Sequence, residues 1–401
     1  MKTLLTIVIT LQVFSILSGQ VGERINNSIK TINLLAPPAA VINNLSDIAS
    51  DVQYIPLQTS ESTLIGRIAD FKTYGGITYI NTRTELICFD KTGRYLYKLN
   101  KVGRGPGEYS FIEDYDINSK GDILILRSHE NIFVYDIKGN EFVFNKLLNI
   151  KSAITNKISN IDFVPGQNNV LLSYECFGEE PFRNIVINLD GNTLNARPNY
   201  YKFTNRIQIM GASPDENINY DFNNSIYFKE WESDTVFTLD QTNKIIPYLI
   251  LNANGKQPTP DDFVKYLNLD ISKMMTSSPI SQNLIIRIVM EVPRYIIYGF
   301  RYLNKEYFEI YDKVLNKKFG IDPRTFFKDD ISGGINFEPK FSGDGRLFSL
   351  VEALALKNYF SGDSFKNSVV KNPEKKKALE KLADSLNETD NPVLIVVTPK
   401  K

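Results

Sequence analysis

The sequence predicts an all-β chain that folds as a six-bladed β-propeller, and three observations lead to that prediction. A strand–turn–strand unit recurs along the chain with a period near 50 residues, which is typical of propeller blades. Two stretches that look helical interrupt the repeat. The last blade lacks one strand, and only the N-terminal part of the chain has a strand to spare for it.

Five segments carry the recurring unit, and each is a β-rich run that ends at a polar turn. Asp, Gly and Asn at such turns tolerate the left-handed backbone that a tight hairpin needs. The aspartates that end the runs are separated by 46, 54, 50 and 72 residues; they are Asp90, Asp136, Asp190, Asp240 and Asp312. A further strand is expected before each turn: Ile77–Ile80, Asp122–Leu126, Val170–Tyr174, Ser225–Phe228 and Tyr295–Tyr298.

The long spacing of 72 residues is explained by an insertion. Residues 258–280 lose strand character and look helical, with Thr259 or Asp261 as the N-cap. A second helical insertion is expected at about 357–390, where a lysine-rich run begins at Pro373. We interpret that charge run as the solvated face of a helix.

The sixth blade has to be built from the C-terminal part of the chain. Its strands are expected at Ile335–Phe341, Arg346–Ala355 and Val393–Val397. The fourth strand is Val52–Leu57, which has no other partner. Pairing it with the C-terminal strand removes an exposed sheet edge and closes the ring.

Four short motifs give the chain a family resemblance. They are Gly103–Tyr109, with the sequence Gly-Arg-Gly-Pro-Gly-Glu-Tyr, together with Tyr54–Leu57, Ser233–Val236 and Asn391–Leu394. In these motifs the chain resembles an exported six-bladed β-propeller family of Gram-negative bacteria, of the NHL-like or TolB-like kind, over about residues 50–400. The resemblance implies the architecture and says little about activity. Many members of that family are lipid-anchored.

The N-terminus reads as a secretory signal. Lys2 precedes an apolar run from Leu4 to Leu17, which is too short to span a membrane comfortably. We therefore predict a signal peptide at 1–20, a lead segment at 21–50 and the propeller at 51–401. No cysteine follows the apolar run, so we expect a periplasmic or secreted protein without a lipid anchor or a membrane span.

Composition narrows the choice of partners. Lys plus Arg and Asp plus Glu both number 46, and this balance argues against a dedicated nucleic-acid-binding protein. We expect a monomer. Cys88 and Cys176 lie in predicted strands of different repeats, where buried free thiols are favoured over a disulfide. His129 is the only histidine, which excludes a two-histidine metal site, and we expect no metal or cofactor.

Alternate connections of a four-stranded meander lie at the same end of the blade. Both insertions therefore fall on one face, where loops converge over the central channel and ligands commonly bind. The candidate ligand-binding residues on this face are Arg83, Arg104, Glu108, His129, Arg183 and Trp231.

Each candidate also has a structural interpretation. Trp231 could stack on a sugar ring or pack in the core. The Gly103–Tyr109 segment could contact an anion, but we favour a role in which Arg104 and Glu108 tie adjacent blades together. For His129 we favour a surface turn.

Two classes of function remain open from the sequence. We favour a non-catalytic binding or scaffolding propeller that recognises a glycan, a peptide or a partner protein, because no catalytic motif stands out. The alternative is a propeller-type glycosidase or polysaccharide lyase, for which Glu179, Glu180 and Asp234 near the rim are acidic candidates. Hydrolysis would require two carboxylates about 5 to 9 Å apart.

Overall fold

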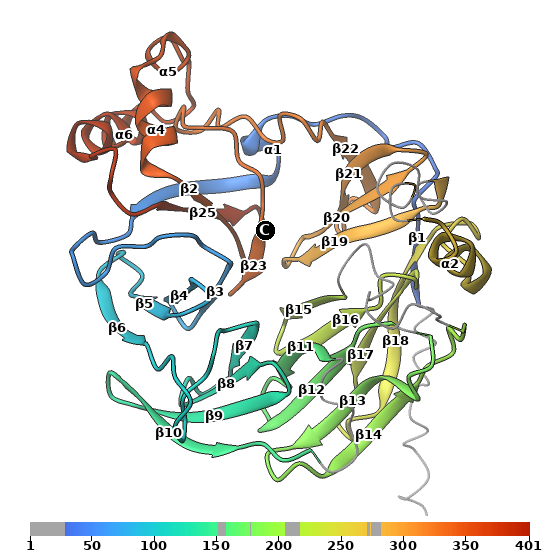
Figure 1. Ribbon diagram of the computed structural model, residues 1–401. Coiled ribbons are helices and arrows are strands. Elements are labelled where there is room, and N and C mark those ends of the chain that lie inside the picture. The colour runs from blue at the N-terminus through green and yellow to red at the C-terminus, as the bar shows by residue number, and fades with distance from the viewer. Residues whose placement is uncertain (1–28, 151–157, 177, 205–216, 271–272, 274–281) are drawn as a thin grey trace, which may run out of the picture.

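Six small sheets stand around a central axis as the blades of a propeller (Figure 1). The computed structural model describes residues 29–150, 158–176, 178–204, 217–270, 273 and 282–401. Each blade is an antiparallel meander of four strands, and one blade carries a fifth strand at its edge. The six-bladed all-β prediction is confirmed.

The strands of each blade run from the channel outwards. Those of blades one to three are β3 Asp70–Tyr74, β4 Ile77–Asn81, β5 Leu86–Phe89 and β6 Tyr95–Leu99; β7 Asp114–Ile117, β8 Ile123–Ser128, β9 Asn131–Lys138 and β10 Glu141–Leu147; and β11 Ile158–Phe163, β12 Asn169–Tyr174, β13 Phe182–Asn188 and β14 Thr193–Pro198. Those of blades four to six are β15 Ile218–Phe222, β16 Ser225–Lys229, β17 Thr235–Leu239 and β18 Ile245–Asn252; β19 Ile285–Glu291, β20 Tyr295–Tyr302, β21 Lys305–Asp312 and β22 Lys317–Ile321; and β23 Phe341–Gly343, β24 Arg346–Val351, β25 Val393–Pro399 and β2 Ala49–Pro56.

A hydrophobic cluster fills each gap between neighbouring blades. Between blades one and two, for example, Tyr79 and Cys88 pack with Tyr115 and Leu124. The central strands of each blade are consequently buried on both faces, which explains their nearly continuous runs of Val, Ile, Leu and aromatic residues. Apolar burial of this kind is the main force that holds stacked sheets together.

The ring is closed by the two ends of the chain. Strand β2 pairs antiparallel with β25, in a register that runs from Ala49 opposite Pro399 to Pro56 opposite Val393, and the blue and red strands lie side by side in Figure 1. Val52 and Val397 are directly opposite and both are buried. The predicted closure is confirmed.

The N-terminal segment before β2 covers two further edges. Strand β1, Lys30–Asn33, pairs parallel with β18 at the outer edge of blade four. The chain then crosses to blade five, where Val41 forms a parallel bridge with Gly320, and it enters the short helix α1, Leu45–Ile48. Nothing in the local sequence pattern predicts the parallel pairing of β1.

Both predicted insertions contain helices, although residues 271–272 and 274–280 of the first lie outside the described residues. Helix α2, Pro260–Leu267, lies between β18 and β19, and Thr259 caps it, because the Thr259 hydroxyl accepts a hydrogen bond from the Asp262 amide at 3.3 Å. Helices α4 Ala353–Ser361, α5 Asp363–Lys366 and α6 Pro373–Ser385 lie between β24 and β25. The strand directions put both insertions at the same end of the blades, which we call the insertion face.

Two predicted strands of blade six were wrong in extent. Most of Ile335–Phe341 is not a strand: Phe337 makes only an isolated bridge with Phe327, and Pro339 has no N–H to give to a ladder. The segment Arg346–Ala355 leaves the sheet after Val351, since the good helix formers from Ala353 onward begin α4.

Two expectations from composition can be compared with the fold. Cys88 and Cys176 are both free and buried. In the part of the chain that the structure describes, no helix combines the length and apolarity needed to cross a membrane. The predicted signal peptide at 1–20 lies outside the described residues.

Candidate functional site

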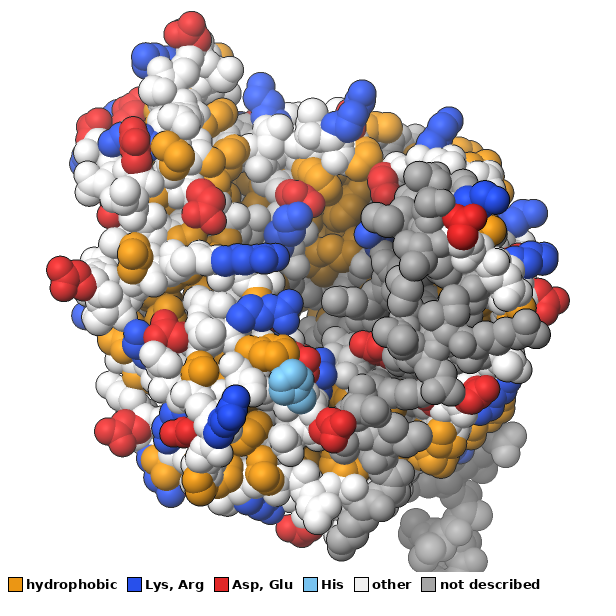
Figure 2. Space-filling view, in the orientation of Figure 1, with side chains coloured by type: hydrophobic (Ala, Val, Ile, Leu, Met, Phe, Trp, Pro, Cys, Tyr) orange, Lys and Arg blue, Asp and Glu red, His pale blue; other side chains and the backbone are white. Residues whose placement is uncertain are grey.

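The inner strands and the loops of the insertion face surround a cavity of about 860 Å³ at the mouth of the central channel. Its wall is polar and of mixed charge, and in Figure 2 Lys and Arg side chains gather beside the hollow at the centre of the disc. Its charged, amide and aromatic residues are Lys72, Arg83, Arg127, Lys340, Asp70, Glu113, Asp114, Asp162, Glu175, Asn160, Asn217, Asn219, Phe71, Trp231 and Phe341. We call this space the mouth cavity.

Lys72 lies at the centre of the acidic side chains. Its Nζ is 3.4 Å from Asp116 Oδ1 and 3.6 Å from Asp162 Oδ1, so strands from three blades meet at one ammonium group. Burial by itself would lower the pKa of Lys72, but the charges of Asp116 and Asp162 outweigh it and hold the pKa well above its usual range. The lysine is a fixed cation of the channel wall.

The aspartates of β7 fasten blade two to blade three. Asp114 Oδ2 accepts a hydrogen bond from the Ile161 amide at 2.7 Å, and Asp116 Oδ2 accepts one from the Phe163 amide at 2.7 Å. Burial raises the pKa of Asp114 to about 7 and that of Asp116 to about 6, although Lys72 opposes both shifts. Raised carboxyl pKa values often mark functional sites, but these oxygens are already committed to backbone amides.

Two arginines approach the mouth cavity from blades one and two. Arg127 Nη1 lies 2.5 Å from Glu113 Oε2, so its charge is balanced within blade two. Arg83 occupies the loop between β4 and β5 with φ of +79°. Its amide donates to Asn81 Oδ1 and its carbonyl accepts from the Ile112 amide, while its side chain is exposed and lines the cavity. Of the predicted candidates, Arg83 is the one whose charged group remains available at the mouth.

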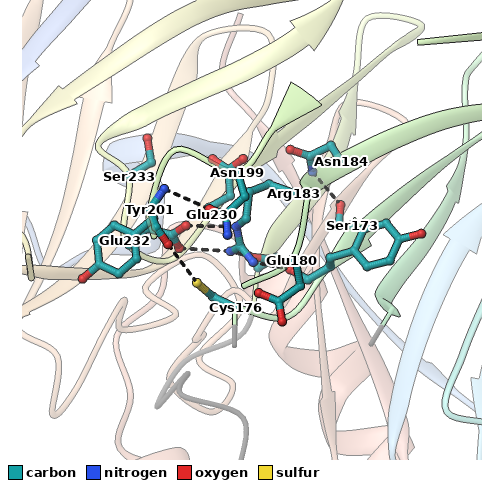
Figure 3. A network of polar contacts seen from close by, with 12 residues as sticks. Ser173, Cys176, Glu180, Arg183, Asn184, Asn199, Tyr201, Glu230, Glu232 and Ser233 are labelled. Carbon is teal, nitrogen blue, oxygen red and sulfur yellow. Dashed lines mark hydrogen bonds and ion pairs between the residues drawn. The ribbon is translucent and has the colours of Figure 1, made fainter. Parts of the chain in front are cut away.

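Arg183 belongs to the wall between blades three and four (Figure 3). Its guanidinium is 1% exposed and pairs with Glu232 at 3.0 Å, and it donates to the Tyr174 carbonyl at 2.6 Å. Asn217 links this pair to the channel, because its amide group donates to Tyr174 O and to Ser159 Oγ. In this position Arg183 supports the cavity wall from behind and presents almost no surface to a ligand.

Trp231 is buried in the core. The indole is 2% exposed, and its ring lies 4.6 Å from Phe263 of α2 and 5.9 Å from Tyr201. It touches the wall of the mouth cavity but offers no open face on which a sugar could stack. Of the two alternatives considered for Trp231, core packing describes its place.

The Gly103–Tyr109 segment connects blades one and two through its backbone and Tyr109. The Tyr109 hydroxyl donates to the Thr84 carbonyl at 2.9 Å, and the Gly107 carbonyl accepts from the Tyr135 hydroxyl at 2.9 Å. Gly107 has φ of +73°, and a Cβ there would collide with Phe144. The segment ties the blades as favoured, but the groups responsible are not Arg104 and Glu108, which are exposed.

The remaining candidates lie beside the cavity. Glu108 accepts a hydrogen bond from the Gly105 amide at 2.7 Å, within its own loop. His129 is exposed in the turn between β8 and β9, with φ of +54°, and its ring packs 4.5 Å from Phe111. The acidic residues Glu179, Glu180 and Asp234 are not among the residues that line the mouth cavity.

The channel residues that sequence reasoning missed share a signal. In five of the six blades, the inner strand or the residue just before it carries polar residues on both sides of a bulky one: Asp70-Phe-Lys72, Asp114-Tyr-Asp116, Asn160-Ile-Asp162, Asn219-Tyr-Asp221 and Lys340-Phe-Ser342. Period-2 polarity in a strand that should be buried on both faces indicates a polar channel. Among the described residues, no group of three or more His, Cys, Asp or Glu side chains is placed to hold a metal ion.

Comparison with known proteins identifies the architecture and a family. The fold is similar to that of a protein from Bacteroides fragilis that is named as exported, with a TM-score of 0.69 and 17% identity over 93% of this chain and 99% of that one. A member of the DUF4221 family from Bacteroides vulgatus matches with a TM-score of 0.48 and 10% identity, over 88% of this chain and 97% of that one. Among curated proteins the comparison found no match.

The family comparison covers nearly the whole propeller. Residues 31–398 match the model of a family described as a domain of unknown function, DUF4934. The match begins at β1 and ends within β25, so it includes both strands that close the ring. The chain belongs to the DUF4934 family.

Proposed function

We propose that the protein is an exported, non-catalytic binding propeller that recognises a glycan at the mouth cavity of the insertion face. The observation that carries the proposal is the composition of that cavity: amide, carboxylate and guanidinium groups beside the half-buried rings of Phe71 and Phe341. A hydroxyl-rich sugar uses polar groups of both kinds, and its C–H patches suit aromatic faces. A volume of about 860 Å³ would accommodate a short oligosaccharide.

The contacts of three of the five wall carboxylates, Asp114, Asp162 and Glu113, favour binding over hydrolysis. Asp114 holds backbone amides, Asp162 accepts from Asn219 at 2.6 Å, and Glu113 is paired with Arg127. A glycosidase needs one carboxyl group free to give up a proton and another free to attack or activate water.

Location and oligomeric state are part of the same proposal. The signal-like residues 1–20 and the similarity in fold to a protein named as exported support a periplasmic or secreted location. A monomer, and the NHL-like or TolB-like kind of propeller, stay predictions.

A glycan array probed with the labelled chain tests the proposed function. We expect binding to a restricted set of glycans, and we expect Arg83→Ala to weaken it at least about tenfold, because this side chain is open at the cavity. Arg324→Ala is the matched control, since Arg324 is exposed and pairs with Asp322 in its own turn. Binding confined to peptides or to a protein, or equal effects of the two variants, would contradict the glycan assignment.

A glycosidase or polysaccharide lyase is the second candidate, and the raised pKa of Asp114, which lines the mouth cavity, is the observation in its favour. Incubation of array-positive polysaccharides with the chain decides between the two. Release of reducing ends or unsaturated products that is lost in Asp114→Asn would establish catalysis; intact polysaccharide supports binding alone.

A further inference from the structure

The opposite end of the channel carries a second cavity, which shares Lys72, Asp162, Asn219 and Phe341 with the mouth cavity and is otherwise lined by different residues. It measures about 400 Å³ and opens between the hairpins that join the first and second strands of the blades. All six of these hairpins lie in described residues. Because it lies at the other end of the blades from the mouth cavity, we call it the rear cavity.

The rear cavity has an excess of negative charge. Lys72 is shared by Asp116 and Asp162, and Glu291 is paired with Lys313 at 2.9 Å. Asp221 also lines the cavity, and its carboxylate has no hydrogen bond or ion pair within the described chain. Desolvation among the inner strands, and then the charges of Asp116 and Asp162, raise the pKa of Asp221 well above its usual range. A bound cation would relieve that repulsion.

Two buried hydroxyl groups in the same wall are without partners. Thr73 is 6% exposed and Ser342 is 3% exposed; both line the rear cavity, and Thr73 Oγ1 and Ser342 Oγ make no hydrogen bond within the described chain. An unpaired buried hydroxyl is costly unless a ligand or water satisfies it. Both oxygens can accept a hydrogen bond from an N–H donor.

Aromatic rings complete the wall. Tyr74, Phe222 and Phe341 are half-buried and line the cavity. Lys313 Nζ already lies 4.3 Å from the ring centroid of Phe222, which shows that a ring in this wall accommodates an ammonium group. Aromatic faces attract cations through their quadrupole.

We propose that the rear cavity binds a primary ammonium group carried on a short apolar chain, with Asp221 as its counter-ion, Thr73 and Ser342 as hydrogen-bond acceptors and the rings around its apolar part. An anion is disfavoured because the only lysine in the wall is held by two carboxylates. A metal ion is disfavoured because no three acidic, His or Cys side chains of the described chain converge on one point.

Calorimetric titration of the full chain with n-pentylamine, and with n-pentanol as its neutral counterpart, tests the site. We expect saturable binding of the amine and affinity for the alcohol lower by at least about tenfold. Asp221→Asn should weaken amine binding by a similar factor. Asp190→Asn, which removes an exposed charge at the same end of the blades, should not.

Thr73→Val separates ligand binding from folding. Removing an unpaired buried hydroxyl while keeping the side-chain shape should leave the melting temperature unchanged or higher, and amine affinity should fall severalfold. Equal binding of amine and alcohol, equal effects of Asp221→Asn and Asp190→Asn, or displacement of the amine by calcium chloride would each overturn the proposal. None of the substituted residues lines the mouth cavity. The result for glycan binding is therefore independent of the result for amine binding.

Discussion

Asp114 and Asp116 each join two blades, and the protonation of their carboxyl groups should make stability depend on pH. Each accepts a hydrogen bond from a β11 amide, and the Ser119 hydroxyl oxygen accepts one from the Gly166 amide at 2.8 Å. The three contacts join residues that are equally far apart in the sequence, and together they fasten blade two to blade three. Because burial holds both carboxyl pKa values above the usual 3.8, the folded chain binds protons in a range where the unfolded chain has released them.

Stability should therefore rise as the pH falls through this range. Between about 7 and 4, the folded state retains the Asp114 proton and the unfolded state does not, so the free energy of unfolding increases toward acid and decreases toward neutral pH. In Asp114→Asn this contribution is absent. The melting temperature of the wild type minus that of the variant should be larger at pH 5.5 than at pH 7.5, by about 1–3 °C; a difference that does not change with pH would contradict the assignment.

The buried pair of Arg183 and Glu232 gives a second prediction at this scale. Arg183→Leu leaves the Glu232 carboxylate buried without its partner and should destabilise the chain by about 3–5 kcal/mol. Replacing both residues by leucine should cost less than the single change. Denaturant unfolding of the three proteins measures this, and a double variant less stable than Arg183→Leu would contradict the penalty assigned to the unpaired Glu232 carboxylate.

At the scale of elements, the sequence pattern predicted the structure correctly where neighbouring strands are joined by short turns. The hairpins predicted from Asp with Gly or Asn are present, because their turns depend on a few adjacent residues. Asp90 Oδ1, for example, accepts hydrogen bonds from the Thr92 and Arg94 amides. The parallel pairing of β1 with β18 and the irregular course before Phe341 were missed. The pairing of β1 depends on contacts with residues more than 200 positions away, and the irregular course depends on a single interrupting proline.

The candidate site was predicted less well than the fold. The face was inferred from connection geometry, yet Trp231 and Arg183 were chosen because they are rare or charged residues in loops, and tertiary packing buries both. Lys72 and the channel aspartates lie in strands, and only their shared alternation across repeats distinguishes them from surface positions. Their proximity depends on the ring, which no single repeat contains.

Strand β2 provides a prediction about the closing element. Val52 is 2% exposed and belongs to the cluster between blades five and six, whereas Gln53 is exposed on the same strand. Val52→Asp should destabilise the chain by about 3 kcal/mol or more, because it buries an unpaired charge. Gln53→Asp should change stability by less than about 0.5 kcal/mol. Thermal unfolding compares them, and similar melting temperatures would argue against a structural role for this closure.

At the scale of the whole molecule, the N-terminal segment protects sheet edges that a propeller would otherwise expose. It pairs with β18 of blade four and hydrogen-bonds to Gly320 of blade five before entering the ring. Unpaired edges are sites for association with other chains. We therefore expect this segment to disfavour edge-to-edge association with other chains.

Removing the segment should change the oligomeric state. A chain that begins at residue 45 retains β2 and the closed ring but leaves the edges of β18 and β22 open, so we expect dimers or larger species by light scattering. A chain that begins at residue 29 is the control and should remain monomeric. Monomeric behaviour of both chains would show that these edges need no cover.

Closure by β2 and β25 also has a consequence for biosynthesis. Val52 pairs with Val397, so five blades can form on a nascent polypeptide while the sixth stays incomplete until residue 397 has been synthesised. A chain that stops before Val393 would lack the partner strand of β2, and we expect its ring to stay open. The seven residues of β25, Val393–Pro399, therefore determine when the ring can close during synthesis.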